Sequence, residues 1–416
     1  MDIDVKVDTY NRLLESIEER AERVTSGKIN CIPCPFPRFR NEFPGLEQSQ
    51  YVIVTANSKI GKSKITDFMF VYNSIDYAFK NKDKLRVKVF YFTLELSADF
   101  KYYQFISYML YTRSNGKIKV SPKDLRSTNA NKVLSSEILE ILKSPDYAEY
   151  FAFFNETVIY ISDIRNPTGI YKFCKNYAIN NGTIHTKKQK IVNKITKEVE
   201  EIEIMDYYTQ DDPDEYRIII LDHISLISVE SDMDLHESIV KLSSDYLVKL
   251  RNDYNYCIVV VQQQAAATES LDNFKANKLE PSTSGLGDCK LTSRDCNILL
   301  GLFSPFRHSI TTYNGYDITK FRDKIRFLQV ILNRDGDSNT ICPLLFEGAV
   351  DYFKELPLPS DVAGMNLVYK YLTADQKLTP TLLSINVKNT SIRKIRIWKK
   401  YFNWSNTRTW NKRIKS

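Results

Sequence analysis

Seven stretches of the chain are almost continuously apolar and do not alternate apolar with polar positions. They run over 51–56, 85–95, 157–164, 216–227, 257–264, 297–303 and 325–334. Continuous apolar runs of this length are typical of strands covered on both faces, as in a parallel sheet flanked by helices. Helical patterns lie between several of them, for example at 238–254. We therefore predict an α/β fold, a mostly parallel twisted sheet with helices on both faces.

An amphipathic helix is predicted over residues 8–27, ahead of the first strand. Asp8 is placed to begin this helix and Gly27 to end it. At helical spacing one face collects the apolar residues Tyr10, Leu13, Leu14, Ile17, Ala21 and Val24. A lone helix of this kind needs a surface on which to bury its stripe, either its own core or a neighbouring subunit.

Residues 181–215 interrupt the pattern of buried strands. They alternate in hydropathy and change from basic to acidic, which predicts a protruding hairpin inserted before the strand at 216–222. We therefore divide the chain into an N-terminal linker helix at 1–30, one α/β domain at 31–360 that contains the hairpin, and a C-terminal extension at 361–416.

The C-terminal extension differs from the rest of the chain in charge. Residues 376–416 hold 11 of the 58 Lys and Arg residues and no acidic residue, so the body is close to neutral despite a net charge of +7. The three Trp residues, Trp398, Trp404 and Trp410, also lie there. Cations beside aromatic rings suit nucleic acid, with phosphates on the cations and bases on the rings. The alternative is a short helical appendage whose Trp side chains pack on the body.

The cysteines and the apolar runs bear on the compartment. The sequence has no apolar run long enough to span a membrane, and its acidic, polar N-terminal stretch is unlike a signal peptide. Seven Cys residues without regular spacing are typical of reduced thiols in a cytoplasm-like compartment. Cys31 and Cys34 form a CxxC pair, but no second pair follows, so we interpret them as incidental thiols and not as half of a zinc site.

The loop after the strand at 51–56 carries a phosphate-binding pattern. Residues 56–63 read ANSKIGKS and fit the P-loop pattern GxxxxGK[ST], except that Ala56 replaces the first Gly. A strand precedes the loop and a helical pattern follows it, as a cradle for phosphates at a helix N-terminus requires. Lys62 is placed to reach the β- and γ-phosphates of ATP, and Ser63 to ligate Mg²⁺. The predicted nucleotide-binding residues are Ala56, Asn57, Ser58, Lys59, Ile60, Gly61, Lys62, Ser63 and, from a later strand, Asp222.

Polar residues at the ends of three later strands complete the candidate site. Asp222 ends the apolar run at 216–222, a position from which a carboxylate holds the Mg²⁺ shell through water. Glu95 ends the strand that follows the P-loop helix, and we assign it as the carboxylate that orients the attacking water. Within the run 262–264 we favour Gln263 by strand register as the γ-phosphate sensor; for each Gln a solvated loop position is the alternative.

These motifs together resemble the ring-forming replicative helicases of the DnaB type, and the helicase half of phage primase–helicases. The resemblance covers about residues 8–356 and is strongest to the phage forms. It rests on ANSKIGKS, FTLELS at 92–97, LDHISLI at 221–227, VVVQQQ at 259–264, GLGDCKLTSRDCNILLGLF at 285–303 and VILNRDGDSNT at 330–340, in that order. It implies a RecA-like P-loop ATPase that holds Mg-ATP through Lys62, Ser63 and Asp222, with Glu95 as the catalytic carboxylate.

The resemblance further implies a homo-hexameric ring with ATP between neighbouring subunits. Arg334 of the next subunit would be the arginine finger on the transferring phosphoryl group, and the linker helix would dock on that subunit. Single-stranded DNA would thread the pore, facing loops at 229–236 and 265–286. Lys275 and Lys278 are the cationic candidates for its phosphates, and a solvated loop charge is the alternative for each. The resemblance also raises a separate primase as a partner.

Two departures from the family keep a second class of function open. The family has Lys two residues before the finger Arg, where this chain has Leu332, and a primase-binding domain ahead of the linker helix, for which the sequence shows no counterpart. The missing charge would lower the rate of hydrolysis without preventing nucleotide binding. The alternative is therefore a RecA-like nucleotide-binding ring protein with little ATPase activity, acting as a scaffold or a recombination-type factor.

Overall fold

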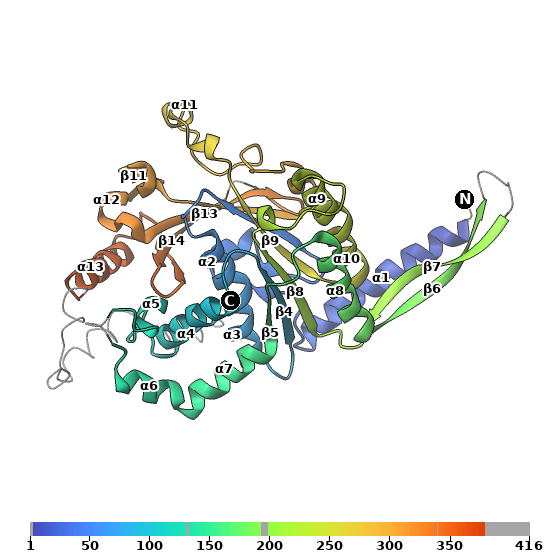
Figure 1. Cartoon of the computed structure of the whole chain (residues 1–416), viewed down its shortest axis with the longest axis horizontal. Helices are drawn as coiled ribbons and strands as arrows, with labels where there is room; N and C mark the ends of the chain where they lie inside the picture. Colours follow the sequence, from blue (N-terminus) through green and yellow to red (C-terminus); the bar gives the residue numbers. More distant parts are fainter. Residues whose placement is uncertain (1–2, 130–132, 193–198, 339, 379–416) are drawn as a thin grey trace, which may run out of the picture.

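A computed structural model of the chain describes residues 3–129, 133–192, 199–338 and 340–378. Within these residues the central sheet has nine strands, in the order β15-β14-β13-β10-β3-β9-β8-β4-β5 (Figure 1). They are β3 (Tyr51–Ala56), β4 (Arg86–Thr93), β5 (Val158–Ile161), β8 (Glu215–Asp222), β9 (Cys257–Gln263), β10 (Ile298–Phe303), β13 (Ile325–Asn333), β14 (Ile341–Glu347) and β15 (Tyr352–Glu355). The six strands from β10 to β5 are parallel, and the other three pair antiparallel. The prediction of a mostly parallel α/β sheet is confirmed.

Each predicted apolar run contains one strand of this sheet, but the sequence did not predict β14 and β15. β15 has only four residues, and β14 contains Pro343, a residue that disfavours a strand prediction. Small two-stranded sheets lie outside the centre: β1 (Ile32–Pro33) with β2 (Gly45–Leu46), and β11 (Thr312–Tyr313) with β12 (Tyr316–Asp317).

Helices cover both faces of the sheet, as the largely apolar sequences of its central strands require. Val52 and Val54 of β3 pack into one core with α2, α3, α4 and α7, whereas Tyr51 and Ile53 pack into a second core with α8, α9 and α10. A third core joins α12 and α13 to β13 and β14. The helices are α1 (Ile3–Thr25), α2 (Lys62–Thr66), α3 (Asn73–Lys80), α4 (Ala98–Arg113), α5 (Pro122–Leu125), α6 (Ser136–Lys143), α7 (Pro145–Thr157), α8 (Pro167–Asn180), α9 (Leu235–Val240), α10 (Val248–Tyr254), α11 (Leu271–Lys275), α12 (Ile318–Phe321) and α13 (Val362–Leu378). Two π-helical segments, Asp67–Tyr72 and Lys241–Leu247, make α2–α3 and α9–α10 continuous.

The helix α1 ends where the sequence predicted but begins earlier. Gly27 has a left-handed backbone, and the N–H groups of Gly27 and Lys28 donate to the carbonyls of Val24 and Arg23 at 3.0 and 2.7 Å. This is the pattern of a glycine that terminates a helix. Its start at Ile3 shows that Asp8 lies inside the helix and does not cap it.

The apolar stripe of α1 is not buried by the described part of the chain. Leu13 and Ile17 are 56% and 63% exposed, and Tyr10 and Val24 are exposed to a similar degree. The C-terminal part of the helix is tied to the body, where Arg23 pairs with Asp214 at 2.7 Å and Arg20 with Glu47 at 2.8 Å. The stripe therefore still requires a surface outside these residues.

The hairpin predicted within 181–215 is formed by β6 (Gly182–Val192) and β7 (Val199–Gln210), which pair antiparallel. It is a separate two-stranded sheet and projects from the same side of the body as α1 (Figure 1). Tyr208 fixes its base, because its hydroxyl donates to the Ala178 carbonyl at 2.8 Å and accepts from Arg217 at 2.7 Å.

The C-terminal extension is described only up to Leu378, at the end of α13. Met365, Val368 and Leu372 of this helix are buried in the third core. The basic segment with Trp398, Trp404 and Trp410 lies outside the described residues. Among the helices that are described, none has both the length and the apolar character that a membrane crossing requires.

Candidate functional site

The segment from Ala56 to Ser63 joins β3 to α2 at the carboxyl end of the parallel strands. Gly61, with a φ of 109°, has a left-handed backbone directly before Lys62, the first residue of the helix. A Cβ at Gly61 would come no nearer than 3.6 Å to Phe346 Cζ, so the backbone angle, not lack of space, requires glycine. A left-handed residue before a helix turns backbone N–H groups toward one point, where they can bind an anion.

Two arginines hold the carbonyl groups of this loop. Arg326 Nε donates to the Ile60 carbonyl oxygen, and Arg307 Nη1 donates to that of Ser58, both at 2.8 Å. Lys59, between these two carbonyls, also has a left-handed backbone, with a φ of 64°. The loop is thus held in shape by its own chain.

The two predicted Mg²⁺ ligands lie against each other. Ser63 Oγ donates to Asp222 Oδ1 at 3.0 Å, while Asp222 Oδ2 accepts from Tyr91 at 2.9 Å and from Lys101 Nζ at 3.3 Å. Burial by itself would raise the pKa of Asp222, but Lys101 and the hydrogen bonds from Tyr91 and Ser63 lower it below its usual value. The carboxylate is therefore charged at neutral pH.

This pair suits an ion that is bound together with a nucleotide. Hydroxyl and carboxylate oxygens are ligands that Mg²⁺ prefers, and Mg²⁺ usually keeps several waters and takes further ligands from phosphates. The described residues contain no group of three or more His, Cys, Asp or Glu side chains that could hold a metal by themselves. Ser63 and Asp222 therefore fit Mg²⁺ with its nucleotide better than a permanently bound metal.

Strand alternation brings one glutamine of three to the P-loop. Gln263, the last residue of β9, has its Oε1 3.4 Å from Lys62 Nζ. Gln262 and Gln264 are buried and bond to the segment 282–292. Gln263 is the one whose side chain can contact a ligand held by Lys62.

Glu95 lies at the same edge of the sheet, in the exposed turn after β4. The N–H of its neighbour Leu94 donates to the Asp222 carbonyl at 2.9 Å, and Arg165 donates to the Leu94 carbonyl at 2.9 Å. These bonds hold the turn beside Asp222 while the Glu95 side chain remains open to solvent.

Arg334 lies at the opposite edge of the sheet from the P-loop. It follows Asn333, the last residue of β13. Asn333 pairs with Ile298 of β10, and Ile298 pairs with Val52 near the amino end of β3, so Arg334 lies at the amino ends of the parallel strands. Its Nε donates to the Cys296 carbonyl at 2.8 Å. Arg334 and the P-loop of one chain are thus separated by the length of β3, roughly 20 Å. Leu332 is partly buried against the second core.

The predicted DNA-facing loops lie on the surface. Lys275 and Lys278 are exposed, and they belong to the segment 265–286 that carries α11. Figure 1 shows α11 at the tip of a projection from the body. The other loop, 229–236, leads into α9, whose first turn is capped by Asp234.

The P-loop is joined directly to the 265–286 segment. Asn57 Nδ2 donates to Thr268 Oγ1 at 2.9 Å. Arg307, which holds the Ser58 carbonyl, also donates to both carboxylate oxygens of Glu269, at 2.7 and 3.0 Å. The P-loop and this segment therefore share direct side-chain contacts.

Sequence reasoning missed several residues of the site, above all Lys101 of α4. Its Nζ contacts Asp67 Oδ2 at 2.9 Å and the Tyr91 hydroxyl at 2.6 Å, in addition to Asp222. Burial raises the pKa of Asp67 to about 6, with Lys101 opposing and Asp222 adding to the effect. A signal existed, because α4 carries apolar residues around its whole circumference, and a helix of that kind buries its polar residues too.

The CxxC cysteines are reduced and protonated. Cys31 and Cys34 are free thiols, and burial raises the pKa of each to about 12. Thiols with such a pKa are unreactive at neutral pH.

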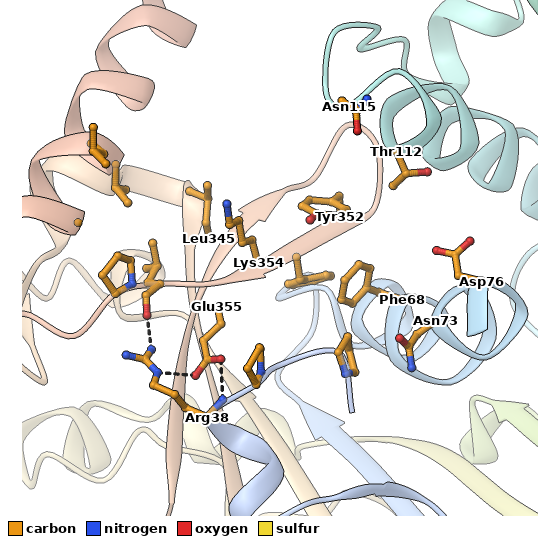
Figure 2. A pocket seen from close by; sticks show the side chains of 18 of the residues that line it. Arg38, Phe68, Asn73, Asp76, Thr112, Asn115, Leu345, Tyr352, Lys354 and Glu355 are labelled. Carbon is orange, nitrogen blue, oxygen red and sulfur yellow. Dashed lines mark hydrogen bonds and ion pairs between the residues drawn. The ribbon is translucent and has the colours of Figure 1, made fainter. Parts of the chain in front are cut away.

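A cavity of about 990 Å³ lies away from the P-loop, between β15, α3, α4 and α13. Figure 2 shows Arg38 at one side of it, where the Arg38 Nε pairs with Glu355 at 2.8 Å, and Phe68, Asp76 and Tyr352 at another. None of the predicted nucleotide-binding residues lines it. Its lining carries both acidic residues, Asp76, Glu355 and Asp361, and basic ones, Arg38, Lys80 and Lys354.

The chain has the fold of the ATPase domains of DnaB-like helicases, as the resemblance of the sequence motifs implied. No family model and no curated protein sequence matches the chain. Among solved structures, a DnaB-like replicative helicase, determined with its interactions with primase, matches with a TM-score of 0.55 at 12% identity. The match covers 82% of this chain and 65% of that helicase. The ATPase domain of a second helicase matches with a TM-score of 0.57 at 13% identity, over 83% of this chain and 98% of that domain.

Proposed function

We propose that the protein is an ATP-dependent replicative DNA helicase, a hexameric ring motor that moves on single-stranded DNA and unwinds duplex. The observation that carries this proposal is the division of the candidate residues between two edges of one sheet. Lys62, Ser63, Asp222 and Gln263 meet at the carboxyl edge, whereas Arg334 lies at the amino edge. A site divided in this way requires a second copy of the chain to complete it.

Within one subunit the P-loop would bind the phosphates of ATP. Lys62 and the backbone N–H groups around Gly61 neutralise the β- and γ-phosphates, and Ser63 with Asp222 would hold Mg²⁺, which neutralises charge developing on the phosphoryl group. Gln263, the last residue of β9, lies beside Lys62 and would contact the γ-phosphate. The end of β9 would thereby respond to whether that phosphate is present. These assignments are supported by the 3.0 Å Ser63–Asp222 contact and by the buried, charged state of Asp222.

The hydrolytic step would use Glu95 and a residue of the neighbouring subunit. Glu95 stands beside Asp222 in a turn held by backbone bonds, where its carboxylate can orient and polarise the attacking water. Arg334 of the next subunit would stabilise charge on the transferring phosphoryl group. In the single chain Arg334 binds carbonyl groups of its own subunit, so assembly must release it.

The segment 265–286 would hold DNA in the pore. Lys275 and Lys278 are exposed cations on a projection, which suits non-specific contacts to backbone phosphates. The bonds from Asn57 and Arg307 to this segment give a route by which the nucleotide state could change the grip on DNA. A separate primase is the partner suggested by the DnaB-like helicase of similar fold.

One observation favours a second function, a nucleotide-binding ring with little turnover. Leu332 takes the place of the family's lysine and packs against the second core, so it supplies no charge near the γ-phosphate of a neighbour. Such a protein would act as a scaffold or a recombination-type factor.

Steady-state ATP hydrolysis by the full-length protein, with and without single-stranded DNA, separates the two functions. We expect DNA to stimulate hydrolysis at least severalfold, and Glu95→Gln to lower the stimulated rate by two orders of magnitude or more while nucleotide still binds. Because Glu95 is exposed, this change leaves the fold intact. Nucleotide binding without turnover in either condition would contradict the motor and favour the scaffold.

A further inference from the structure

Lys101 is a fully buried cation that the roles above leave without a task. It is 0% exposed, and its ammonium lies within 3.3 Å of three oxygens, from Asp67, Tyr91 and Asp222. Removing a lysine from water is costly unless charged partners compensate. Two carboxylates around one ammonium supply that compensation.

A structural ion pair would need only one of these carboxylates. Asp67, on the helix that follows the P-loop, already binds Lys101 at 2.9 Å. Lys101 also contacts Asp222, the carboxylate of the proposed metal site, and it contacts only one of the two Asp222 oxygens, Oδ2. Oδ2 of Asp222 is taken by Lys101 and Tyr91, and Oδ1 by Ser63.

This division of oxygens fixes the orientation of Asp222. A carboxylate at the end of a strand could otherwise rotate about its terminal bond, which is a soft torsion. Lys101 and Tyr91 hold Oδ2 on the side of α4, so Oδ1 stays on the side of Ser63. Groups that orient ligands in this way commonly contribute ten- to a hundredfold to metal affinity.

We propose that Lys101 is a positioning residue of the metal site: anchored by Asp67, its ammonium holds Asp222 Oδ2 and keeps Oδ1 facing Ser63, where the Mg²⁺ of a nucleotide would bind. The inference rests on the proposed nucleotide site and adds to it a residue that no P-loop motif includes. It implies that Lys101 matters for nucleotide bound with Mg²⁺ and not for nucleotide bound without it, because Lys62 and the loop amides hold phosphates directly.

The test measures binding, not turnover. The dissociation constant of a fluorescent N-methylanthraniloyl-ADP is measured for the full-length protein in Mg²⁺ and in EDTA, and the ratio gives the affinity gained from Mg²⁺. The variant is Asp67→Asn/Lys101→Met, because it removes both charges of the Asp67–Lys101 pair, while Asp222 keeps its hydrogen bonds from Tyr91 and Ser63. We expect its Mg²⁺ gain to fall about tenfold, with the constant in EDTA within about twofold of wild type.

Two further variants separate positioning from a general loss of packing. Lys64→Met/Asp351→Asn removes another ion pair of the P-loop helix, 2.6 Å long, that does not touch Asp222, and it should keep the full Mg²⁺ gain. Tyr91→Phe removes only the hydroxyl between Lys101 and Asp222 and should lower the gain about threefold. If Asp67→Asn/Lys101→Met does not fold, the Mg²⁺ gain of Tyr91→Phe decides whether Lys101 orients Asp222.

The other outcomes are distinct. A parallel loss of affinity in both buffers means that Lys101 only supports the fold, and an unchanged or larger Mg²⁺ gain means that it does not orient Asp222; either result overturns the inference. If wild type itself binds nucleotide without any gain from Mg²⁺, the metal site is wrong and the inference falls with it. If wild type binds no nucleotide, the proposed function fails as well.

Discussion

Burial separates the roles of the lysine side chains. Lys62 is mostly buried yet reaches the mouth of the P-loop, where a phosphate can replace the contact to Gln263. Lys101 is sealed between two carboxylates. Lys275 is exposed and bears a charge that only an external partner such as DNA could use. The sequence points to Lys62, because it belongs to a phosphate-binding motif, and to Lys275, because it lies in a polar loop.

Lys354 is a fourth case, and it predicts a pH dependence of stability. Burial beside the cavity of Figure 2 lowers its pKa to about 8 from 10.5. Below pH 8 Lys354 is charged in the folded and in the unfolded protein. Burying that charge costs the folded state at most about 3 kcal/mol. Between pH 8 and 10.5 the folded state loses the proton first, so this cost disappears as the pH rises.

We therefore expect Lys354→Met to unfold at higher urea concentration than wild type at pH 7, with the difference closing by about pH 10.5. Urea titrations of both proteins at several pH values check this. Lys275→Met, at an exposed position, should track wild type throughout. A difference for Lys354→Met that stays constant with pH would show that packing, not charge, is responsible.

At the scale of elements, the strands were predictable because their signal is local. A strand buried on both faces is apolar at every position, and seven runs of that kind located seven of the nine strands in the central sheet of the described residues. The sequence did not predict β14 and β15, at the antiparallel end of the sheet, because β15 has only four residues and β14 contains Pro343.

The candidate site divides in the same way. The P-loop, Asp222 and Glu95 lie at or just after the ends of strands, so the motifs that contain them could be recognised from the sequence alone. Lys101 and Arg307 act through partners far away in sequence, Lys101 with Asp222 and Arg307 with Ser58 and Glu269. Contacts of this kind arise from how the elements pack, and no single stretch of sequence records them.

Arg307 should therefore couple the P-loop to the segment with α11. Arg307→Met removes the bonds to the Ser58 carbonyl and to Glu269 together. We expect ATP hydrolysis without DNA to change less than threefold, and the stimulation by single-stranded DNA to fall at least fivefold. ATPase assays at increasing DNA concentration check this.

Glu269→Gln is the matched variant for Arg307→Met. It weakens the contact of Arg307 to the segment 265–286 and keeps the contact of Arg307 to the Ser58 carbonyl. It should reproduce the loss of stimulation with a smaller effect on basal hydrolysis. Full stimulation in both variants would show that the bridge carries no coupling.

Two features of the described residues support the proposed assembly of several copies of the chain. The apolar stripe of α1 is exposed, and Arg334 lies at the wrong edge of the sheet to reach its own P-loop. A P-loop and an arginine at opposite ends of the parallel strands suit a head-to-tail interface, which closes into a ring when the rotation allows.

Leu13→Ser/Ile17→Ser tests the stripe. Because both residues are exposed in the described chain, we expect the free energy of unfolding of the subunit to change by less than about 0.5 kcal/mol. Sedimentation velocity with nucleotide should show the assembled species replaced by monomer. Glu15→Ser/Glu18→Ser, on polar positions of the same helix, should assemble as wild type does. Normal assembly of the Leu13/Ile17 variant would mean that the stripe serves another surface.

The proposed division of the active site between subunits predicts a result that neither single variant can give alone. Lys62→Ala loses the P-loop lysine but keeps a finger, and Arg334→Ala loses the finger but keeps a P-loop, so each alone should be inactive. In rings reassembled from an equal mixture, about one interface in four joins an intact P-loop to an intact Arg334, and hydrolysis should recover toward a quarter of the wild-type rate. ATPase assays after mixing under dissociating conditions measure this. Recovery requires Arg334 to act on its neighbour; a mixture as inactive as its components would place the whole site within one chain, against the separation of Arg334 from its own P-loop.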